Sequence, residues 1–175
     1  MPITSTTTTR PRIYAACLAS YAAGRLHGVW IDAAQPAEDI RAAIDAMLAA
    51  SPVAGAEEHA IHDHEGFLGA RVGEHEDLDN LSALTSAIAT HGELLAGLLD
   101  HVDDLDDALD ALENRYQGAF DSLSDWAASY IDDVMDVPTA LAGYLDYSAW
   151  ARDAVLSGDV FAVEAEGKTH VFTSV

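Results

Sequence analysis

The stretch LLDHVDDLDDALDALENRY, residues 98–116, combines a regular apolar stripe with a high density of acidic side chains. Its apolar residues recur at alternating spacings of three and four, which is the periodicity of one face of an α-helix. The spacing predicts one continuous helix that packs this face on a core. The stripe consists of Leu95, Leu98, Val102, Leu105, Leu109, Leu112 and Tyr116.

The other face of this predicted helix carries charge of one sign. Arg115 is its only base, and the residues three and four positions earlier are Leu112 and Ala111, so Arg115 relieves none of the acids. Eight acid pairs fall at i,i+3 or i,i+4 spacing. At roughly 0.2–0.5 kcal/mol each they cost about 2–4 kcal/mol, a sizeable share of the roughly 5–15 kcal/mol by which a domain is stable. The acids are Asp100, Asp103, Asp104, Asp106, Asp107, Asp110 and Glu113.

The whole chain is acidic, and the charge is concentrated in one region. Its 175 residues include 30 acids against 8 Lys and Arg, for a formal net charge of −22. Residues 72–151 hold eighteen acids and one base, a net charge of −17. Such a field repels nucleic acid and membrane surfaces and attracts a basic partner. Because 50% of the residues are hydrophobic, we expect a folded protein and not a disordered acidic tail.

Cysteine usage and the N-terminus indicate the compartment. Cys17 is the only cysteine, which excludes an internal disulfide and suits a reducing environment. The opening MPITSTTTTRP lacks the apolar segment of a secretory signal. No window approaches the roughly 20 apolar residues of a membrane span. We therefore expect a soluble, cytoplasmic protein that binds neither nucleic acid nor membrane.

The order of predicted elements indicates an α+β fold of three small modules. Residues 1–11 are expected to be a disordered leader, and residues 12–70 an N-terminal α+β module. A helical acidic module follows over residues 71–115, and a C-terminal α+β module with helices and a β-hairpin over residues 116–175. Alternation predicts strands, and 3.6-residue periodicity predicts helices. The strands are expected over 12–20, 27–33, 59–66 and the two arms of 159–175, and the helices over 34–50, 78–90, 122–135 and 144–156.

Candidate catalytic and metal-binding residues are few. Cys17 has His27 as a neighbour in sequence, but a buried strand cysteine that packs as a small hydrophobe is the simpler interpretation. The Asp-rich stretch has no glycine where an EF-hand calcium loop requires one. No phosphate-binding, dinucleotide-binding or hydrolase motif is present. We predict no catalytic residue, no metal and no cofactor. The metal-like candidates are His59, His62, His64 and His75.

The carboxylates of residues 100–113 approach the spacing of phosphates along DNA. Duplex DNA carries about one negative charge per 1.7 Å of its axis. The helix spans roughly 20 Å, along which a duplex places about 12 phosphates, roughly 6 on each strand. Seven carboxylates over that length match the density of one strand. This interpretation explains why the acids are left unpaired, because neutralising them would remove the likeness to DNA.

Several segments resemble the ArdA family of antirestriction proteins. VMDVPTALAGYLDY, residues 134–147, resembles that family's antirestriction motif, with its D-V-P and its Y-[FL]-D-Y ending. RIYAACLASYAAGRLHGVWIDA and AIHDHEGF are similar to its opening module, and YQGAFDSLSDWA and the C-terminal hairpin to its later part. The likeness covers nearly the whole chain beyond the leader. The threonine-rich leader departs from it, and the middle is similar only in acidity.

The resemblance implies a function. It implies a non-enzymatic DNA mimic of mobile genetic elements that binds type I restriction–modification enzymes in place of DNA and protects incoming DNA. The surface it would occupy is the DNA-binding groove of the enzyme's specificity and methyltransferase core. It also implies an elongated homodimer with the motif at the dimer contact. The motif residues are Asp136, Val137, Pro138, Leu141, Tyr144, Leu145, Asp146 and Tyr147.

We expect exposed acids to carry the mimicry, and we call the following sixteen the acidic surface. Two alternatives stay open: a haloadapted acidic domain without mimicry, and a metal-dependent enzyme built on the histidine cluster. Haloadaptation predicts acids spread evenly over the chain, which the concentration in residues 72–151 opposes. The acidic surface comprises Glu74, Glu76, Asp77, Asp79, Glu93, Asp100, Asp103, Asp104, Asp106, Asp107, Asp110, Glu113, Asp121, Asp125, Asp132 and Asp133.

Overall fold

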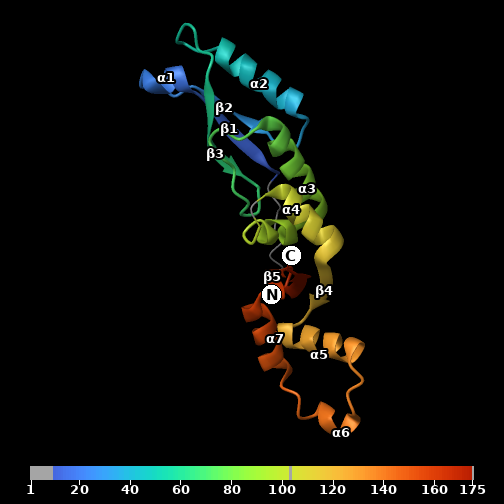
Figure 1. Ribbon diagram of the computed structural model, residues 1–175. Coiled ribbons are helices and arrows are strands. Elements are labelled where there is room, and N and C mark those ends of the chain that lie inside the picture. The colour runs from blue at the N-terminus through green and yellow to red at the C-terminus, as the bar shows by residue number, and fades with distance from the viewer. Residues whose placement is uncertain (1–9, 103, 175) are drawn as a thin grey trace, which may run out of the picture. The chain divides into compact units, whose positions relative to one another are not determined.

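A computed structural model describes residues 10–102 and 104–174 (Figure 1). The chain divides into two compact units, residues 1–92 and 93–175. Each holds one three-stranded antiparallel sheet packed with helices, which confirms the α+β class. The division into three modules is not confirmed and stays a prediction. The elements are β1 (Arg12–Cys17), α1 (Leu18–Ala22), β2 (Gly28–Asp32), α2 (Ala37–Ala49), β3 (His59–Glu65), α3 (Leu78–Leu98), α4 (Leu105–Asp110), the π-helix η1 (Ala111–Arg115), β4 (Tyr116–Phe120), α5 (Leu123–Val134), α6 (Thr139–Ala142), α7 (Tyr147–Ser157), β5 (Val160–Ala165) and β6 (Lys168–Thr173).

The first unit packs helices on a sheet with strand order β2-β1-β3. Alternate residues of a strand face the same side, and the paired Ile13 and Ile31 are both buried. Helix α2 contacts β1 and β2, and its Ile44 is buried as well. The first part of α3 joins this core through Thr85, whose buried hydroxyl donates to the carbonyl of Ala33 at 2.9 Å.

The start of the first unit differs from the sequence prediction at two points. Strand β1 ends at Cys17 and not at residue 20, because the Cys17 thiol accepts a hydrogen bond from the backbone N–H of Ser20 and caps α1. Of the predicted leader, residues 1–9 lie outside the described residues. Arg10 and Pro11 are tied to the end of β2: Arg10 Nε lies 3.0 Å from Asp32 Oδ2, and Ala33 donates to the Pro11 carbonyl at 2.9 Å.

The predicted continuous acidic helix is wrong. Gly92 breaks α3 as expected, with φ 58° and ψ −140°, and the helix then ends at Leu98. A new helix, α4, starts after Asp104, whose extended backbone has φ −145° and ψ 175°. The chain then passes through η1, and Tyr116 already belongs to β4. The apolar stripe is therefore distributed over four elements, α3, α4, η1 and β4, with Val102 between the first two, since periodicity along the chain does not report whether the backbone is continuous.

The break lowers the electrostatic cost of the acids. Four of the eight predicted acid pairs contain Asp100 or Asp103, which lie outside α4 and η1. Asp106 and Asp107 occupy the first turn of α4. Acids there are stabilised by the partial positive charge of the helix N-terminus, whereas a long helix would have placed them in its middle.

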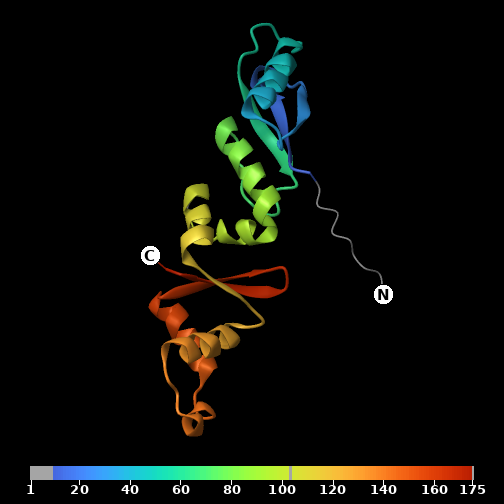
Figure 2. The ribbon, with the colours of Figure 1, turned by 90° about the vertical axis from the view of Figure 1, so that its right-hand side faces the viewer.

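The second unit sandwiches its sheet, with strand order β4-β6-β5, between two helical layers (Figure 2). One face packs against α5 and α7 in a core that includes Trp126, Ala151 and Val171. The end of α3 lies close to the other face, where His101 stacks on Phe161 with ring centroids 5.7 Å apart. Strand β4 was not predicted, because Gly118 reads as an interruption and is instead a bulge in its pairing with β6.

Several local signals in this unit are confirmed. The Ser122 hydroxyl accepts from the Asp125 N–H at 3.2 Å and caps α5. Gly158 ends α7 in the left-handed conformation with φ 80°. The hairpin of β5 and β6 turns at Glu166 and Gly167, which have φ 54° and 75°. Helix α7 begins at residue 147 and not at 144, because Asp146 Oδ1 accepts from the backbone N–H of Ala149 at 2.9 Å and caps it there.

Candidate functional site

The acidic surface is almost entirely exposed. Asp103 lies outside the described residues, and of the other fifteen acids all are exposed except Glu76, which is half-buried. Four of the sixteen belong to the first unit and twelve, from Glu93 onward, to the second. Among the described residues, only Asp110 and Asp121 of this set lie within 4.0 Å of a Lys or Arg nitrogen. The set therefore presents mostly uncompensated charge to solvent.

Helix α4 and η1 hold the densest part of this surface. Asp104 Oδ1 accepts from the backbone N–H of Asp107 at 2.9 Å, so one carboxylate begins the helix and the others follow on its exposed side. Ala108 and Ala111 are fully buried and fix the inner side. The remaining acids of this segment, Asp106, Asp107, Asp110 and Glu113, are all exposed.

Arg115 does relieve this segment, contrary to the sequence prediction. Its Nε lies 3.1 Å from Asp110 Oδ2, and its Nη2 donates to the carbonyl of Asp107 at 2.8 Å. The prediction assumed α-helical spacing, in which residues three and four apart are neighbours. Residues 111–115 instead form a π-helix, whose hydrogen bonds join residues five apart, and Asp110 is the fifth residue before Arg115.

Other acids of this surface also cap a helix or pair with a lysine. Asp77 Oδ1 accepts from the backbone N–H groups of Asp79 and Asn80 at 2.9 and 3.1 Å, at the start of α3. Lys168 donates a hydrogen bond to Asp121, and this bond together with the ammonium charge lowers the pKa of that carboxyl. Acids of this set thus combine capping or pairing with exposure.

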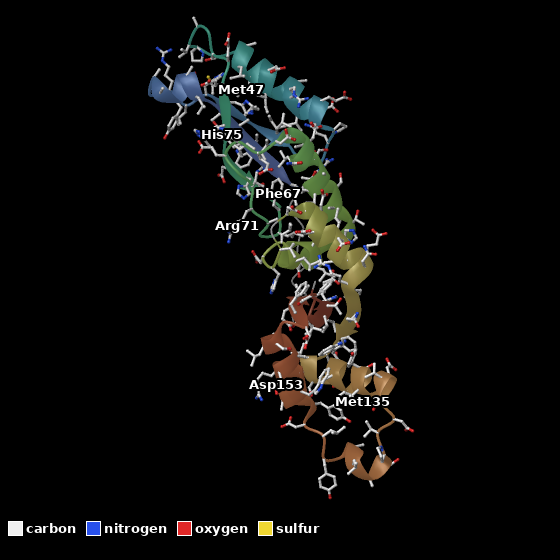
Figure 3. The ribbon with its side chains drawn as sticks, viewed as in Figure 1. Met47, Phe67, Arg71, His75, Met135 and Asp153 are labelled. Atoms are coloured by element: carbon white, nitrogen blue, oxygen red, sulfur yellow. The ribbon has the colours of Figure 1, made fainter. Side chains whose placement is uncertain are left out.

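The residues of the antirestriction motif connect α5 to α7 and expose apolar side chains. Met135, labelled in Figure 3, caps the end of α5 and is 56% exposed. Leu141 on α6 is 55% exposed, and Tyr144 after it is 87% exposed. Figure 1 shows α6 at the tip of the connection, away from the core of α5 and α7. Clustered apolar exposure of this kind marks an interaction surface more often than a plain solvent-facing loop.

The other motif residues divide between solvent and core. Tyr147 is half-buried and packs against the core of α5, α7 and the sheet. Val137 is half-buried too, and the remaining residues of the motif set are exposed: Asp136, Pro138, Leu145 and Asp146.

The histidine cluster does not converge. His62 packs edge-on against Tyr21, with ring centroids 4.9 Å apart, and His64 against Phe67 at 5.6 Å. Burial, with a smaller contribution from the positive charge of nearby His75, lowers the pKa of His59. Within the described part of the chain, no group of three His, Cys, Asp or Glu side chains is arranged to hold a metal ion.

Cys17 and His27 do not form a nucleophile–base pair. The fully buried Cys17 thiol lies 3.5 Å from Ser51 Oγ. The His27 ring instead bonds through Nε2 to the carbonyl of Met47 at 2.7 Å. Cys17 and His27 share a backbone hydrogen bond, from the Cys17 N–H to the His27 carbonyl at 2.9 Å. The arrangement is that of the packed end of the central strand of the sheet.

None of the helices in the described residues combines the length and the apolar character that crossing a bilayer would need.

Comparison with protein families gives a match over most of the chain. A protein-family model described as "Antirestriction protein (ArdA)" matches residues 13–167, which include the exposed motif, α4, nearly all of the first sheet, and strands β4 and β5 of the second. No curated protein matches the chain.

Proposed function

We infer the function from one premise: the chain belongs to the ArdA family of antirestriction proteins. We propose that it is a non-enzymatic DNA mimic of a mobile genetic element. It binds type I restriction–modification enzymes in the cytoplasm, occupies the DNA-binding groove of their specificity and methyltransferase core, and so protects incoming DNA. The observation that carries this proposal is the exposed and mostly uncompensated charge of the acidic surface.

The charge density of α4 and η1 supports the mimicry even though the predicted long helix does not form. Residues 104–113 carry five carboxylates. At about 1.5 Å per residue they span roughly 14 Å, along which one strand of a duplex places about 4 phosphates. The local density is therefore still that of a DNA strand, on a shorter element. A groove lined with Lys and Arg would be attracted to it over a range that salt shortens.

The exposed motif supports a homodimer. Leu141, Tyr144 and Met135 present apolar and aromatic side chains without a cover in the described part of the chain. Tyr and Met are enriched in the buried centre of protein interfaces. We propose that a second copy covers this surface, and that the dimer presents two acidic surfaces to the enzyme.

The test is a competition for DNA. A purified type I methyltransferase core is bound to labelled target duplex and titrated with this protein at two salt concentrations. We expect displacement near stoichiometric protein that weakens as salt rises, since both complexes depend on charge. No displacement at either salt would reject the proposed target.

A matched pair of variants separates local mimicry from total charge. The first neutralises the five carboxylates of residues 104–113 as Asn or Gln, and the second neutralises five exposed acids of the first unit outside the acidic surface. Both variants have the same net charge. We expect the first to displace DNA markedly less well and the second to resemble wild type. Equal losses would favour a general effect of acidity, as haloadaptation implies. The control positions are Glu38, Asp39, Asp45, Glu57 and Glu58.

A further inference from the structure

Arg115 is the single base among eighteen acids in residues 72–151, and its side chain is only 14% exposed. An isolated base in such a region would be expected to reach into solvent or to neutralise whichever carboxylate lies nearest. Arg115 instead lies beneath α4. There its Nη2 donates to the backbone carbonyl of Asp107 at 2.8 Å, and its Nε approaches Asp110 Oδ2 at 3.1 Å.

The two contacts of Arg115 differ in kind: one reaches the backbone of α4 and the other a carboxylate side chain. The Asp107 carbonyl already accepts from the backbone N–H of Ala111, so the bond from Arg115 Nη2 is a second one to the same oxygen and ties the guanidinium to the backbone of α4. The Nε contact is electrostatic: within the described residues the Nε–H has no hydrogen-bond acceptor, although it lies close to the Asp110 carboxylate. Together they attach the acidic helix to the half-buried Arg115 cation at two points.

Arg115 also stands where the acidic segment joins the sheet. It is the last residue of η1, and β4 starts at Tyr116. Thr173 of β6 donates through its hydroxyl to the Arg115 carbonyl at 3.4 Å. Tyr116 then pairs with Phe172 in the β4–β6 ladder. The backbone of Arg115 is thus anchored in the sheet, and its side chain reaches back to α4.

We propose that Arg115 is a positioning residue for the DNA-mimic surface: its largely shielded guanidinium holds α4 so that the exposed carboxylates of Asp106, Asp107 and Asp110 stand at fixed places. This inference rests on the proposed function. The planar guanidinium of Arg115 contacts a carbonyl and a carboxylate together, and a lysine ammonium cannot reproduce this geometry. Arg115 therefore affects binding through the acids whose positions it fixes.

A net-charge effect and a positioning effect predict opposite changes in binding when Arg115 is replaced. Arg115→Gln removes the one positive charge of the region, so an attraction that depends on net charge alone would strengthen. If the guanidinium positions α4, the carboxylates lose their common arrangement and binding weakens despite the added negative charge. The matched control is Arg152→Gln, which removes the same charge at a side chain that is 66% exposed and, within the described residues, forms its ion pair with its neighbour Asp153 at 3.5 Å.

The experiment is the DNA competition, run at several salt concentrations with wild type, Arg115→Gln, Arg115→Lys and Arg152→Gln, each confirmed folded by circular dichroism at the assay temperature. We expect both Arg115 variants to displace DNA about tenfold less well, or about 1.4 kcal/mol, and Arg152→Gln to match or exceed wild type. The salt dependence of displacement should become shallower for the Arg115 variants, because fewer carboxylates engage at once.

Three results would overturn the inference. Displacement by Arg115→Gln equal to or better than wild type would show that charge alone matters. Full rescue by Arg115→Lys would show that the planar guanidinium is not needed. A loss with an unchanged salt dependence in the folded variants would show that the same number of carboxylates still engages, and would reject the positioning role. Failure of wild type itself to displace DNA would overturn the proposed function and this inference with it, so the two failures are distinguishable.

Discussion

Substitutions at Asp104 separate its role as a helix cap from its role as a charge. Asp104 Oδ1 accepts from the Asp107 N–H at 2.9 Å and starts α4, while its carboxylate is exposed. Asp104→Ala removes the cap, which costs about 1 kcal/mol within a range of roughly 0.5–2 kcal/mol. Asp104→Asn keeps an acceptor. It forfeits a helix-dipole attraction of roughly 0.3–1 kcal/mol but relieves repulsion of about 0.2–0.5 kcal/mol from Asp107, so it should be nearly neutral.

The magnitude is measurable in a unit of this size. For a domain of 60–100 residues, a loss of 1 kcal/mol lowers Tm by about 4–8 °C. We therefore expect Asp104→Ala to lower the unfolding temperature of residues 93–175 by about that amount, and Asp104→Asn by clearly less, about 1–2 °C at the central values of its two opposing terms. Both should displace DNA like wild type at a temperature where they are folded, because one of many carboxylates contributes little to a distributed field.

The assay is thermal unfolding followed by circular dichroism, together with the DNA competition on the same preparations. If Asp104→Asn were as destabilising as Asp104→Ala, the hydrogen bond to Asp107 would not explain the effect and capping would be rejected. If the Asn variant were stable but lost most of its displacement, the carboxylate would be a dominant contact, and the idea of a distributed field would fail.

Three further predictions concern the dimer, pH and packing. Tyr144→Ser, at an 87% exposed position, should convert the dimer to a monomer in sedimentation with little change in unfolding free energy; an unchanged mass would refute the proposed contact. Burial, assisted by the charge of nearby His75, lowers the pKa of His59 below its ordinary 6.5, so the unfolded chain binds the proton more readily. Stability in urea should therefore fall as pH drops below about 6.5, and His59→Gln should flatten that slope. A Cβ at Gly28 would lie 2.6 Å from a carbonyl oxygen of β1, so Gly28→Ala should cost about 1–3 kcal/mol, whereas Gly143→Ala, with no atom within 4 Å, should not destabilise.

Local signals in the sequence predicted local structure well. Ser122 caps α5, Gly92 breaks α3, and Glu166 with Gly167 turns the hairpin, each as its residue type indicates. These predictions succeed because capping and left-handed backbone conformations depend on the residue itself and its immediate neighbours. The capping thiol of Cys17 was missed for the corresponding reason: cysteine is not among the residues that usually cap helices, so the end of β1 carried no recognisable signal.

The apolar stripe of residues 95–116 shows where such reasoning fails. Its periodicity was compatible with one long helix, but only Leu95 and Leu98 of the stripe are buried. Val102, Leu105, Leu109 and Leu112 are half-buried and Tyr116 is exposed, whereas the buried residues of α4 and η1 are Ala108 and Ala111, which the stripe did not include. The backbone nevertheless breaks before Asp104, because that residue caps a second helix. Relief of acid–acid repulsion and the pairing of β4 with β6 favour the break, and neither can be read from spacing along the chain.

The sequence by itself determined the charge, its concentration in residues 72–151 and the α+β class, because these follow from composition and from periodicities of a few residues. The tertiary structure decided which acids stay uncompensated, and that the half-buried Arg115 side chain contacts α4. It also placed β4, through contacts such as the 2.9 Å hydrogen bond between the Tyr116 hydroxyl and His170 Nδ1. Those two residues are 54 positions apart. Only the packing of the folded chain brings such residues together, and no local pattern records it.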